Sequence, residues 1–197
     1  MTLASEAPVY AWRHPRPLGA EGRCIGARTD LPVDPRRAKR LAHRIRRVAC
    51  RQGLPRVVAT SPLQRCAAVG RWLKRWGWTH RIDADLIEVD FGAWDGQHWP
   101  TIAVAEIDAW CADFHRYAPG GGEPLARLLQ RATAWQPAGA RLVVTHGGWL
   151  LARRWQQDHP DGRAPLAADW PPAPHYGECV ALNPGRPGTT GTAPAEP

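Results

Sequence analysis

The sequence predicts an α/β fold of three layers, in which helices cover both faces of a mostly parallel sheet. Two observations indicate this class. Strand-like apolar runs alternate with helical patterns along the chain, and 197 residues of 44% hydrophobic composition can bury one full core but not two. We therefore expect a single domain over residues 1–182, with a small helical cap inserted at about 97–135. Residues 183–197 contain mainly Pro, Gly and Thr and are expected to form a disordered tail.

The individual elements follow from hydrophobic patterning and from the residues that start and stop them. Short apolar runs predict strands over residues 9–12, 56–60, 79–83, 142–145 and 178–182. Apolar residues at helical intervals predict helices over about 35–52, 61–76, 99–114, 123–135 and 147–157. Pro35 suits the first position of its helix. Ser61, followed by Pro62, predicts that a serine hydroxyl caps the second helix.

The charge balance is basic, with a formal net charge of +8 and a pI near 9.9. Almost all the basic residues are arginine, and the excess favours phosphate-bearing ligands only weakly. The Arg-rich stretch over 36–47 is interpreted as the solvated side of an amphipathic helix. The alternative, a nucleic-acid face, has no accompanying motif. Since no apolar run reaches the length of a signal peptide or a membrane span, we expect a cytoplasmic protein without a membrane partner.

The five cysteines are scattered along the chain, without the short paired spacing of a thiolate metal site, and we expect reduced thiols and no metal. One segment, Cys50 to Arg56, has the C-x5-R spacing of cysteine-dependent phosphatases. In those enzymes the loop follows a strand and precedes a helix. Here a predicted helix precedes the segment and a predicted strand follows it, so we reject cysteine chemistry.

Charged and imidazole side chains follow three of the predicted strands. Arg13 and His14 end the first strand, Arg65 lies shortly after the second, and His146 and Gly147 follow the strand over 142–145. In open α/β sheets, ligands bind outside the carboxyl ends of the strands. The sequence therefore predicts that two imidazoles and two guanidiniums converge at one edge of the sheet.

This mixture of groups suits phosphoryl transfer. The transition state spreads negative charge over three oxygens, which guanidinium forks and the N-termini of the helices near Ser61 and Gly147 can bind. A neutral imidazole among these cations can attack phosphorus, and a separate acid must protonate the departing alkoxide. Glu88 is the best candidate for that acid, although three nearby carboxylates compete, those of Asp85, Asp90 and Asp95. No cofactor is implied.

Four motifs in this order resemble those of the histidine phosphatase superfamily, which includes the phosphoglycerate mutase-like enzymes. They are Arg13-His14, the segment 61–65 (SPLQR), the segment 88–96 (EVDFGAWDG) and the segment 144–148 (VTHGG). The resemblance covers about residues 9–182. It implies that His14 forms a phosphohistidine, that Arg13 and Arg65 bind the phosphate, that Glu88 donates the proton and that His146 contacts the phosphoryl group.

Two further segments extend the resemblance. Residues 119–123 (PGGGE) resemble a glycine-glutamate joint that shapes the substrate side of the pocket and adds Glu123 to the candidate substrate-binding residues. The segment 23–32 (RCIGARTDLP) looks like the loop of α-ribazole phosphatase relatives in cobalamin synthesis, with one extra residue. That insertion leaves open whether Arg28 or Arg23 reaches the phosphate. Pro15 departs from the family, whose common residue after the histidine is glycine.

The resemblance favours hydrolysis of a small phosphorylated substrate, with α-ribazole phosphate as first candidate and a sugar or other small phosphate next. Mutase-type transfer is the alternative within the family. It is less favoured because mutases carry a longer insertion between the acid and the second histidine than this sequence has. A family member that has lost catalysis is disfavoured because all four catalytic positions hold competent side chains. The oligomeric state stays open.

Overall fold

The computed structural model describes residues 8–183, so the tail expected from residue 183 lies outside the described residues except for Asn183. Its centre is a sheet of five strands in the order β3-β2-β4-β1-β5. The strands are β1 (Val9–Arg13), β2 (Val57–Thr60), β3 (Thr79–Ile82), β4 (Leu142–Thr145) and β5 (Cys179–Leu182). Neighbouring strands are parallel except β5, which is antiparallel to β1. The predicted α/β class with a mostly parallel sheet is confirmed.

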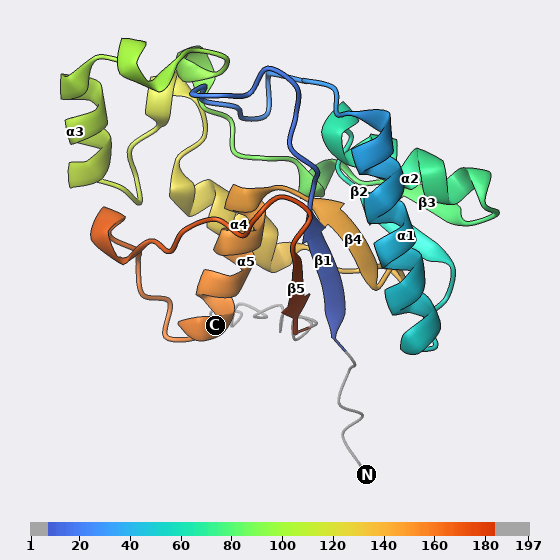
Figure 1. Ribbon diagram of the computed structural model, residues 1–197. Helices are drawn as coiled ribbons and strands as arrows, with labels where there is room; N and C mark the ends of the chain where they lie inside the picture. Colours follow the sequence, from blue (N-terminus) through green and yellow to red (C-terminus); the bar gives the residue numbers. More distant parts are fainter. Residues whose placement is uncertain (1–7, 184–197) are drawn as a thin grey trace, which may run out of the picture.

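Helices cover both faces of this sheet. Figure 1 shows α1 (Pro35–Arg51) and α2 (Gln64–Arg75) on one side of the strands, and α4 (Leu125–Ala134) and α5 (Gly147–Asp158) on the other. Side chains of β1 alternate between the two cores: Ala11 packs in the cluster of α4 and α5, and Trp12 in the cluster of α1 and α2. Trp12 is 1% exposed, and burial of a large apolar side chain contributes about 1.5–3 kcal/mol.

Local sequence signals account for the start and end of α1. The carboxylate of Asp34 accepts hydrogen bonds from the N–H groups of Arg36 (2.7 Å) and Arg37 (3.1 Å), and Pro35 occupies the first position. Gly53, with a φ of +59°, follows the C-terminus in the left-handed region that favours glycine. Since α1 ends at Arg51 and β2 begins at Val57, the structure has the helix-before-strand order on which we rejected cysteine chemistry.

The expected cap of α2 is wrong. The helix begins at Gln64, without a side-chain cap, and not at the turn of Ser61 and Pro62. The Ser61 hydroxyl instead accepts from the N–H of Leu63 (3.3 Å) and lies 2.7 Å from Nε2 of His146. The serine therefore serves the cluster at the sheet edge and not the helix.

The expected helix over 99–114 divides into two pieces, a 3-10 turn over Trp99–Thr101 and α3 (Val104–Ala112). Ile102 and Ala103 are extended between them, because Pro100 and the following turn interrupt the helical pattern. In Figure 1, α3 lies away from the sheet, beyond the helices α4 and α5. None of the helices in residues 8–183 is long and apolar enough to cross a membrane.

The topology places a crevice between β1 and β4. These strands are parallel neighbours, but the chain leaves β1 for α1 on one face and leaves β4 for α5 on the other. Where the connections after two neighbouring strands go to opposite faces, a crevice forms at the carboxyl ends of the strands. Ligands of α/β proteins bind in such a crevice. Residues that directly follow β1 and β4 therefore line this crevice.

Candidate active site

The two histidines of the sequence motifs meet at the crevice between β1 and β4. Arg13 pairs with Thr145 in the parallel register, which brings the next residues, His14 and His146, side by side. Their ring centroids are 5.0 Å apart, with an interplanar angle of 62°. His14 is 4% exposed and His146 is fully buried.

The imidazole of His14 is held in one tautomer. Its Nδ1 lies 2.7 Å from the carbonyl oxygen of Pro15, and because a carbonyl only accepts, Nδ1 carries the hydrogen and Nε2 carries a lone pair. Burial and the positive charge of Arg65 hold the pKa of His14 well below its usual value of 6.5. His14 is therefore neutral at pH 7, with a free nucleophilic nitrogen.

Arg65 reaches this site from the first turn of α2 and is 1% exposed. Its Nε donates to Nδ1 of His146 (3.2 Å), and its two terminal nitrogens donate to the carbonyl oxygens of Thr29 and Gly26, each at 2.8 Å. The acceptors are thus an imidazole and two carbonyls. The loop over 23–32 supplies both of these carbonyls and so fixes the guanidinium at the crevice.

Arg13 precedes His14 at the end of β1. Its Nη1 donates to the carbonyl oxygen of Pro174 (2.8 Å), and its guanidinium stacks 4.0 Å above the ring centre of Tyr176. Its Nε is buried and has no hydrogen-bond partner among the described residues. Within residues 8–183, neither Arg13 nor Arg65 forms an ion pair with a carboxylate. Cations that are buried or half-buried and lack a counter-charge favour binding of an anion at this point.

His146 is more constrained than the sequence motif suggested. Its Nδ1 accepts from Arg65, so in the neutral ring Nε2 carries the hydrogen and donates to the Ser61 hydroxyl. Burial and the charge of Arg65 hold its pKa well below the usual value. Both ring nitrogens therefore have partners inside the protein, and contact of His146 with a phosphoryl group stays a prediction. The sequence analysis missed Ser61 as a partner of His146.

Glu88 lies against the first turn of α5 and is 8% exposed. Its Oε2 accepts from the N–H of Gly148 (3.2 Å), and its Oε1 accepts from those of Trp149 (3.2 Å) and Val89 (3.1 Å). Two of the competing carboxylates are occupied elsewhere: Asp90 pairs with Arg28, and Asp95 accepts from the backbone of the 23–32 loop. Glu88 is thus the acidic group that the structure fixes beside the helix that follows His146.

From the sequence we expected the backbone N–H groups at the starts of α2 and α5 to bind phosphate oxygens. In the structure, several of these N–H groups donate to carboxylates of the chain. The N–H of Gln64, at the start of α2, donates to the carboxylate of Asp30 at 2.6 Å. The N–H groups of Gly148 and Trp149, at the start of α5, are taken by Glu88. The chain's own carboxylates therefore occupy these positions, which leaves the guanidiniums of Arg13 and Arg65 as the principal candidates for anion binding.

The remaining sequence candidates have other contacts. Arg28 forms a two-pronged ion pair with Asp90, at 2.7 and 2.9 Å, and Arg23 donates to the carbonyl oxygen of Gly96 at 2.8 Å. Gly147 lies against Arg13, because a Cβ atom on this glycine would be 3.3 Å from the guanidinium carbon. The structure thus brings Gly147 to the phosphate side of the site but engages Arg28 and Arg23 elsewhere. Phosphate binding by any of the three stays a prediction.

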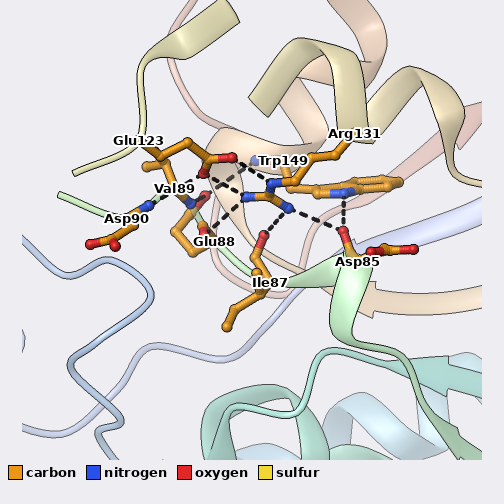
Figure 2. Close-up of polar contacts among 8 residues, drawn as sticks. All are labelled: Asp85, Ile87, Glu88, Val89, Asp90, Glu123, Arg131 and Trp149. Atoms are coloured by element: carbon orange, nitrogen blue, oxygen red, sulfur yellow. Dashed lines mark hydrogen bonds and ion pairs between the residues drawn. The ribbon is translucent and has the colours of Figure 1, made fainter. Parts of the chain in front are cut away.

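Arg131, which the sequence analysis missed, holds the segment that carries Glu88. Figure 2 shows its guanidinium donating to the carbonyl oxygens of Asp85 (3.1 Å), Ile87 (2.8 Å) and Glu88 (3.1 Å). It also donates to both carboxylate oxygens of Glu123, at 2.8 and 3.0 Å. Glu123, expected on the substrate side, is therefore bound to Arg131, and a direct contact with substrate stays a prediction.

An apolar cavity of about 310 Å³ adjoins the acid. Val89 and Gly148, which flank the Glu88 side chain, belong to its wall. Aromatic residues form much of the remainder, namely Phe91, Trp110, Phe114 and Trp170. Trp110 comes from the expected cap, whereas Trp170 comes from the loop after α5 and was not singled out in the sequence analysis.

Comparison with known proteins identifies the family. The sequence profile of the histidine phosphatase superfamily (branch 1) matches residues 9–163. The chain belongs to this superfamily. No curated protein matches the sequence significantly. The family assignment confirms the resemblance that the four motifs indicated.

Solved structures are similar to this histidine phosphatase over nearly the whole chain. TTHB049 from Thermus thermophilus has 27% identity and a TM-score of 0.62, with 89% of this chain and 93% of that chain covered. Bacillus stearothermophilus YhfR has 24% identity and a TM-score of 0.66 (87% and 88% covered). The mycobacterial glucosyl-3-phosphoglycerate phosphatase Rv2419c, in complex with VO3, has 21% identity and a TM-score of 0.65 (91% and 100% covered). At these identities the last two show the shared fold alone.

Proposed function

We propose that this histidine phosphatase hydrolyses a small phosphate monoester in two steps, through a phosphohistidine on His14. The observation that carries the proposal is the free Nε2 lone pair of His14 beside two guanidiniums, the buried Arg65 and the half-buried Arg13, that within residues 8–183 lack a carboxylate partner. A phosphate monoester supplies the missing negative charge and an electrophilic phosphorus at the same point.

In the first step, Nε2 of His14 attacks phosphorus and the bond from phosphorus to the ester oxygen breaks. Arg13 and Arg65 stabilise the phosphoryl oxygens, and protonated Glu88 gives its proton to the departing alkoxide. In the second step, the Glu88 carboxylate takes a proton from water while the water oxygen attacks phosphorus. The phosphorus–nitrogen bond breaks, inorganic phosphate leaves, and His14 and protonated Glu88 are restored.

Hydrolysis is proposed over mutase-type transfer because of the length of the chain between the acid and the second histidine. A mutase must shield the phosphoenzyme from water while an intermediate reorients, and members of that branch carry a longer insertion there. Here the segment between Glu88 and His146 forms only α3, α4, β4 and short turns. Mutase-type transfer of a phosphoryl group is the alternative.

For the substrate, α-ribazole 5'-phosphate is the first candidate, on the resemblance of the segment 23–32 to the loop of α-ribazole phosphatases. This loop is part of the site, since Gly26 and Thr29 bind Arg65 through their carbonyl oxygens. A sugar phosphate or another small phosphate ester comes next. A nucleic-acid partner is not proposed.

A hydrolysis screen tests the proposal. Release of inorganic phosphate is measured across a panel of small esters, including α-ribazole 5'-phosphate, 3-phosphoglycerate and several sugar phosphates. We expect turnover that His14→Ala abolishes, with α-ribazole 5'-phosphate among the best substrates. Conversion of 3-phosphoglycerate to 2-phosphoglycerate without phosphate release would favour the mutase alternative, and equal turnover by His14→Ala would exclude His14 as nucleophile.

A further inference from the structure

We propose that the apolar cavity beside Glu88 receives the leaving group, and that the substrate is a phosphate ester whose leaving group has an apolar, aromatic portion. This inference rests on the proposed hydrolysis at His14. It adds what the chemistry at His14 does not determine, namely the class of molecule that is dephosphorylated.

The first turn of α5 links the phosphate side of the site to the cavity. A Cβ atom on Gly147 would lie 3.3 Å from the Arg13 guanidinium, and one on the next residue, Gly148, would lie 2.5 Å from Oε1 of Glu88. Gly148 also belongs to the cavity wall. The Arg13 guanidinium, the Glu88 carboxyl group and the cavity therefore lie next to one another along this turn. An ester oxygen protonated by Glu88 has the rest of its leaving group on the side where the cavity lies.

The cavity wall is suited to an aromatic ring. The ring centroids of Trp110 and Phe114 are 5.3 Å apart, and those of Phe114 and Trp170 are 5.8 Å apart. These spacings are those of aromatic rings in contact, so the wall on this side is a packed aromatic surface, against which a further aromatic group can pack. A volume of about 310 Å³ is at the lower end of small-molecule sites, which span about 300–1,000 Å³. The cavity therefore has room for a small ring system.

The same wall disfavours a sugar. In the described part of the chain, one charged residue, Glu123, lines the cavity, and both of its carboxylate oxygens already accept hydrogen bonds from Arg131. The remaining polar side-chain groups of the wall are the indole N–H groups of Trp110 and Trp170 and the Cys111 thiol. A sugar buried there would leave most of its hydroxyl groups without partners, at a cost of about 1–3 kcal/mol each. The wall therefore selects apolar over polyhydroxylated leaving groups.

Two aromatic esters test the cavity without changing the chemistry of the leaving group. Phenyl phosphate and 2-naphthyl phosphate release phenols of nearly equal acidity but differ by one fused ring. We expect kcat/KM for 2-naphthyl phosphate to be at least about tenfold higher, because the second ring becomes buried in the cavity. Equal values for the two esters would overturn the proposal.

A cavity-filling variant with a matched control locates the effect. Cys111 is exposed but lines the cavity, whereas its exposed neighbour Ala112 on α3 does not. Cys111→Phe should abolish the preference for the naphthyl ester, while Ala112→Phe should preserve it. A second filler, Ala167→Leu, enlarges a residue of the loop after α5. A naphthyl preference that survives both fillers contradicts the proposal.

The proposed function and this inference fail in different ways. If neither ester yields a phosphohistidine on the wild-type protein, the proposed function is wrong. If phenyl phosphate yields a phosphohistidine but the naphthyl ester is no better a substrate, the hydrolase stands and the assignment of the cavity is wrong.

A separate observation, the clamp formed by Arg131, carries a second inference. We infer that Arg131 is a positioning residue that sets the Glu88 carboxylate for proton transfer. The five N–H groups of its guanidinium match the five hydrogen bonds that it donates, of which three go to carbonyl oxygens of residues 85–88 and two to Glu123. Glu123 continues the clamp, because its own N–H donates to the carbonyl oxygen of Asp90 at 2.6 Å. The segment is thus held on both sides of Glu88 (Figure 2).

Arg131→Lys tests this role, since lysine keeps the charge and loses the planar fork. We compare kcat/KM for benzyl phosphate, whose alkoxide needs a proton, with that for p-nitrophenyl phosphate, whose phenolate leaves without one. The variant should lose at least about tenfold with benzyl phosphate and less than about threefold with p-nitrophenyl phosphate. The control is Arg127→Lys, on the solvent side of the same helix, which should change neither value. Among the described residues, the exposed Arg127 side chain has no hydrogen-bond or ion-pair partner.

A double variant separates positioning from a general loss of structure. If Arg131 acts through Glu88, Arg131→Lys should cause no further loss with benzyl phosphate once Glu88→Gln is present. Equal losses with the two esters, or a further tenfold loss in the Glu88→Gln background, would contradict the inference. If Arg131→Lys does not fold, Glu123→Gln loosens the same clamp from its other end and should give the same selective loss.

Discussion

A Cβ atom on Gly148 would lie 2.5 Å from Oε1 of Glu88, closer than real Cβ atoms approach an oxygen. The proposed acid is thus packed directly against the helix that follows the second histidine. On the neighbouring glycine, Gly147, a Cβ atom would be in tight contact with the Arg13 guanidinium at 3.3 Å and with the Ala173 side chain at 3.2 Å. Two adjacent glycines therefore lie against two groups with different proposed functions, Glu88 for proton donation and Arg13 for phosphate binding.

Replacement of the two glycines should separate these functions. Gly148→Ala displaces the Glu88 carboxylate, so kcat/KM for benzyl phosphate should fall about 10–100-fold while p-nitrophenyl phosphate is affected less than about threefold. Gly147→Ala moves Arg13, which every ester needs, and should lower kcat/KM for both substrates alike. Steady-state kinetics with both esters checks the contrast. Identical profiles for the two variants would mean that Glu88 is not the proton donor.

The sequence predicted the parts of this site that depend on local patterns. The ends of β1 and β4 could be located from short apolar runs, and parallel pairing then places His14 beside His146. The contacts of Ser61 and Arg131 could not be predicted. Each forms hydrogen bonds with residues that are distant in the sequence. Ser61 and His146 are 85 positions apart, and Arg131 and Glu88 are 43 positions apart. Hydrophobic periodicity carries no information about such pairs.

The failure at the helix N-termini has a physical cause. A helix N-terminus favours any nearby negative group, and the sequence does not say whether a ligand or the chain's own carboxylate will provide it. Here Asp30 and Glu88, which lie 34 and 60 positions from their amide partners Gln64 and Gly148, occupy the two sites. Only the folded chain shows that these amides are occupied, which leaves the guanidiniums as the main candidates for anion binding.

Removal of the Arg65 charge should raise the pKa of His14. After burial, this guanidinium is the main cause of the lowered pKa, because its positive charge disfavours the imidazolium. In Arg65→Gln the His14 ring should therefore take up its proton at a higher pH than in the wild type. The titration can be followed by NMR of the ring C–H signals, with the His14→Ala spectrum used for assignment. An unchanged or lower pKa would show that Arg65 does not act on His14.

The two buried histidines should make stability depend on pH. Their pKa values are lower in the folded protein than in the unfolded chain, so below about pH 6.5 the unfolded chain binds more protons than the folded protein. The free energy of unfolding should therefore fall as the pH drops below about 6.5, by up to about 1.4 kcal/mol per pH unit for each histidine. Urea unfolding at pH 7.5 and 5.5 measures the slope. His146→Gln should reduce it by about half, and a slope unaltered in that variant would argue against a buried neutral His146.

Cysteine chemistry should have no part in the reaction. Cys50 is exposed at the last turn of α1, where the helix precedes the C-x5-R segment and β2 follows it. Its thiol therefore does not sit in a loop whose amides point at a phosphate. Cys50→Ser should keep kcat/KM within about twofold of the wild type for all substrates, measured by phosphate release. A loss of more than about tenfold would reopen the rejected alternative.

The central claim is that Nε2 of His14 accepts the phosphoryl group between Arg13 and Arg65. Brief incubation with a 32P-labelled substrate, followed by rapid quenching in base, tests it most directly. We expect the label to remain on the wild-type protein in a form that is stable to base and lost in acid, and His14→Ala to retain none. Label that survives acid, or that His14→Ala acquires equally, would contradict a phosphohistidine at this position.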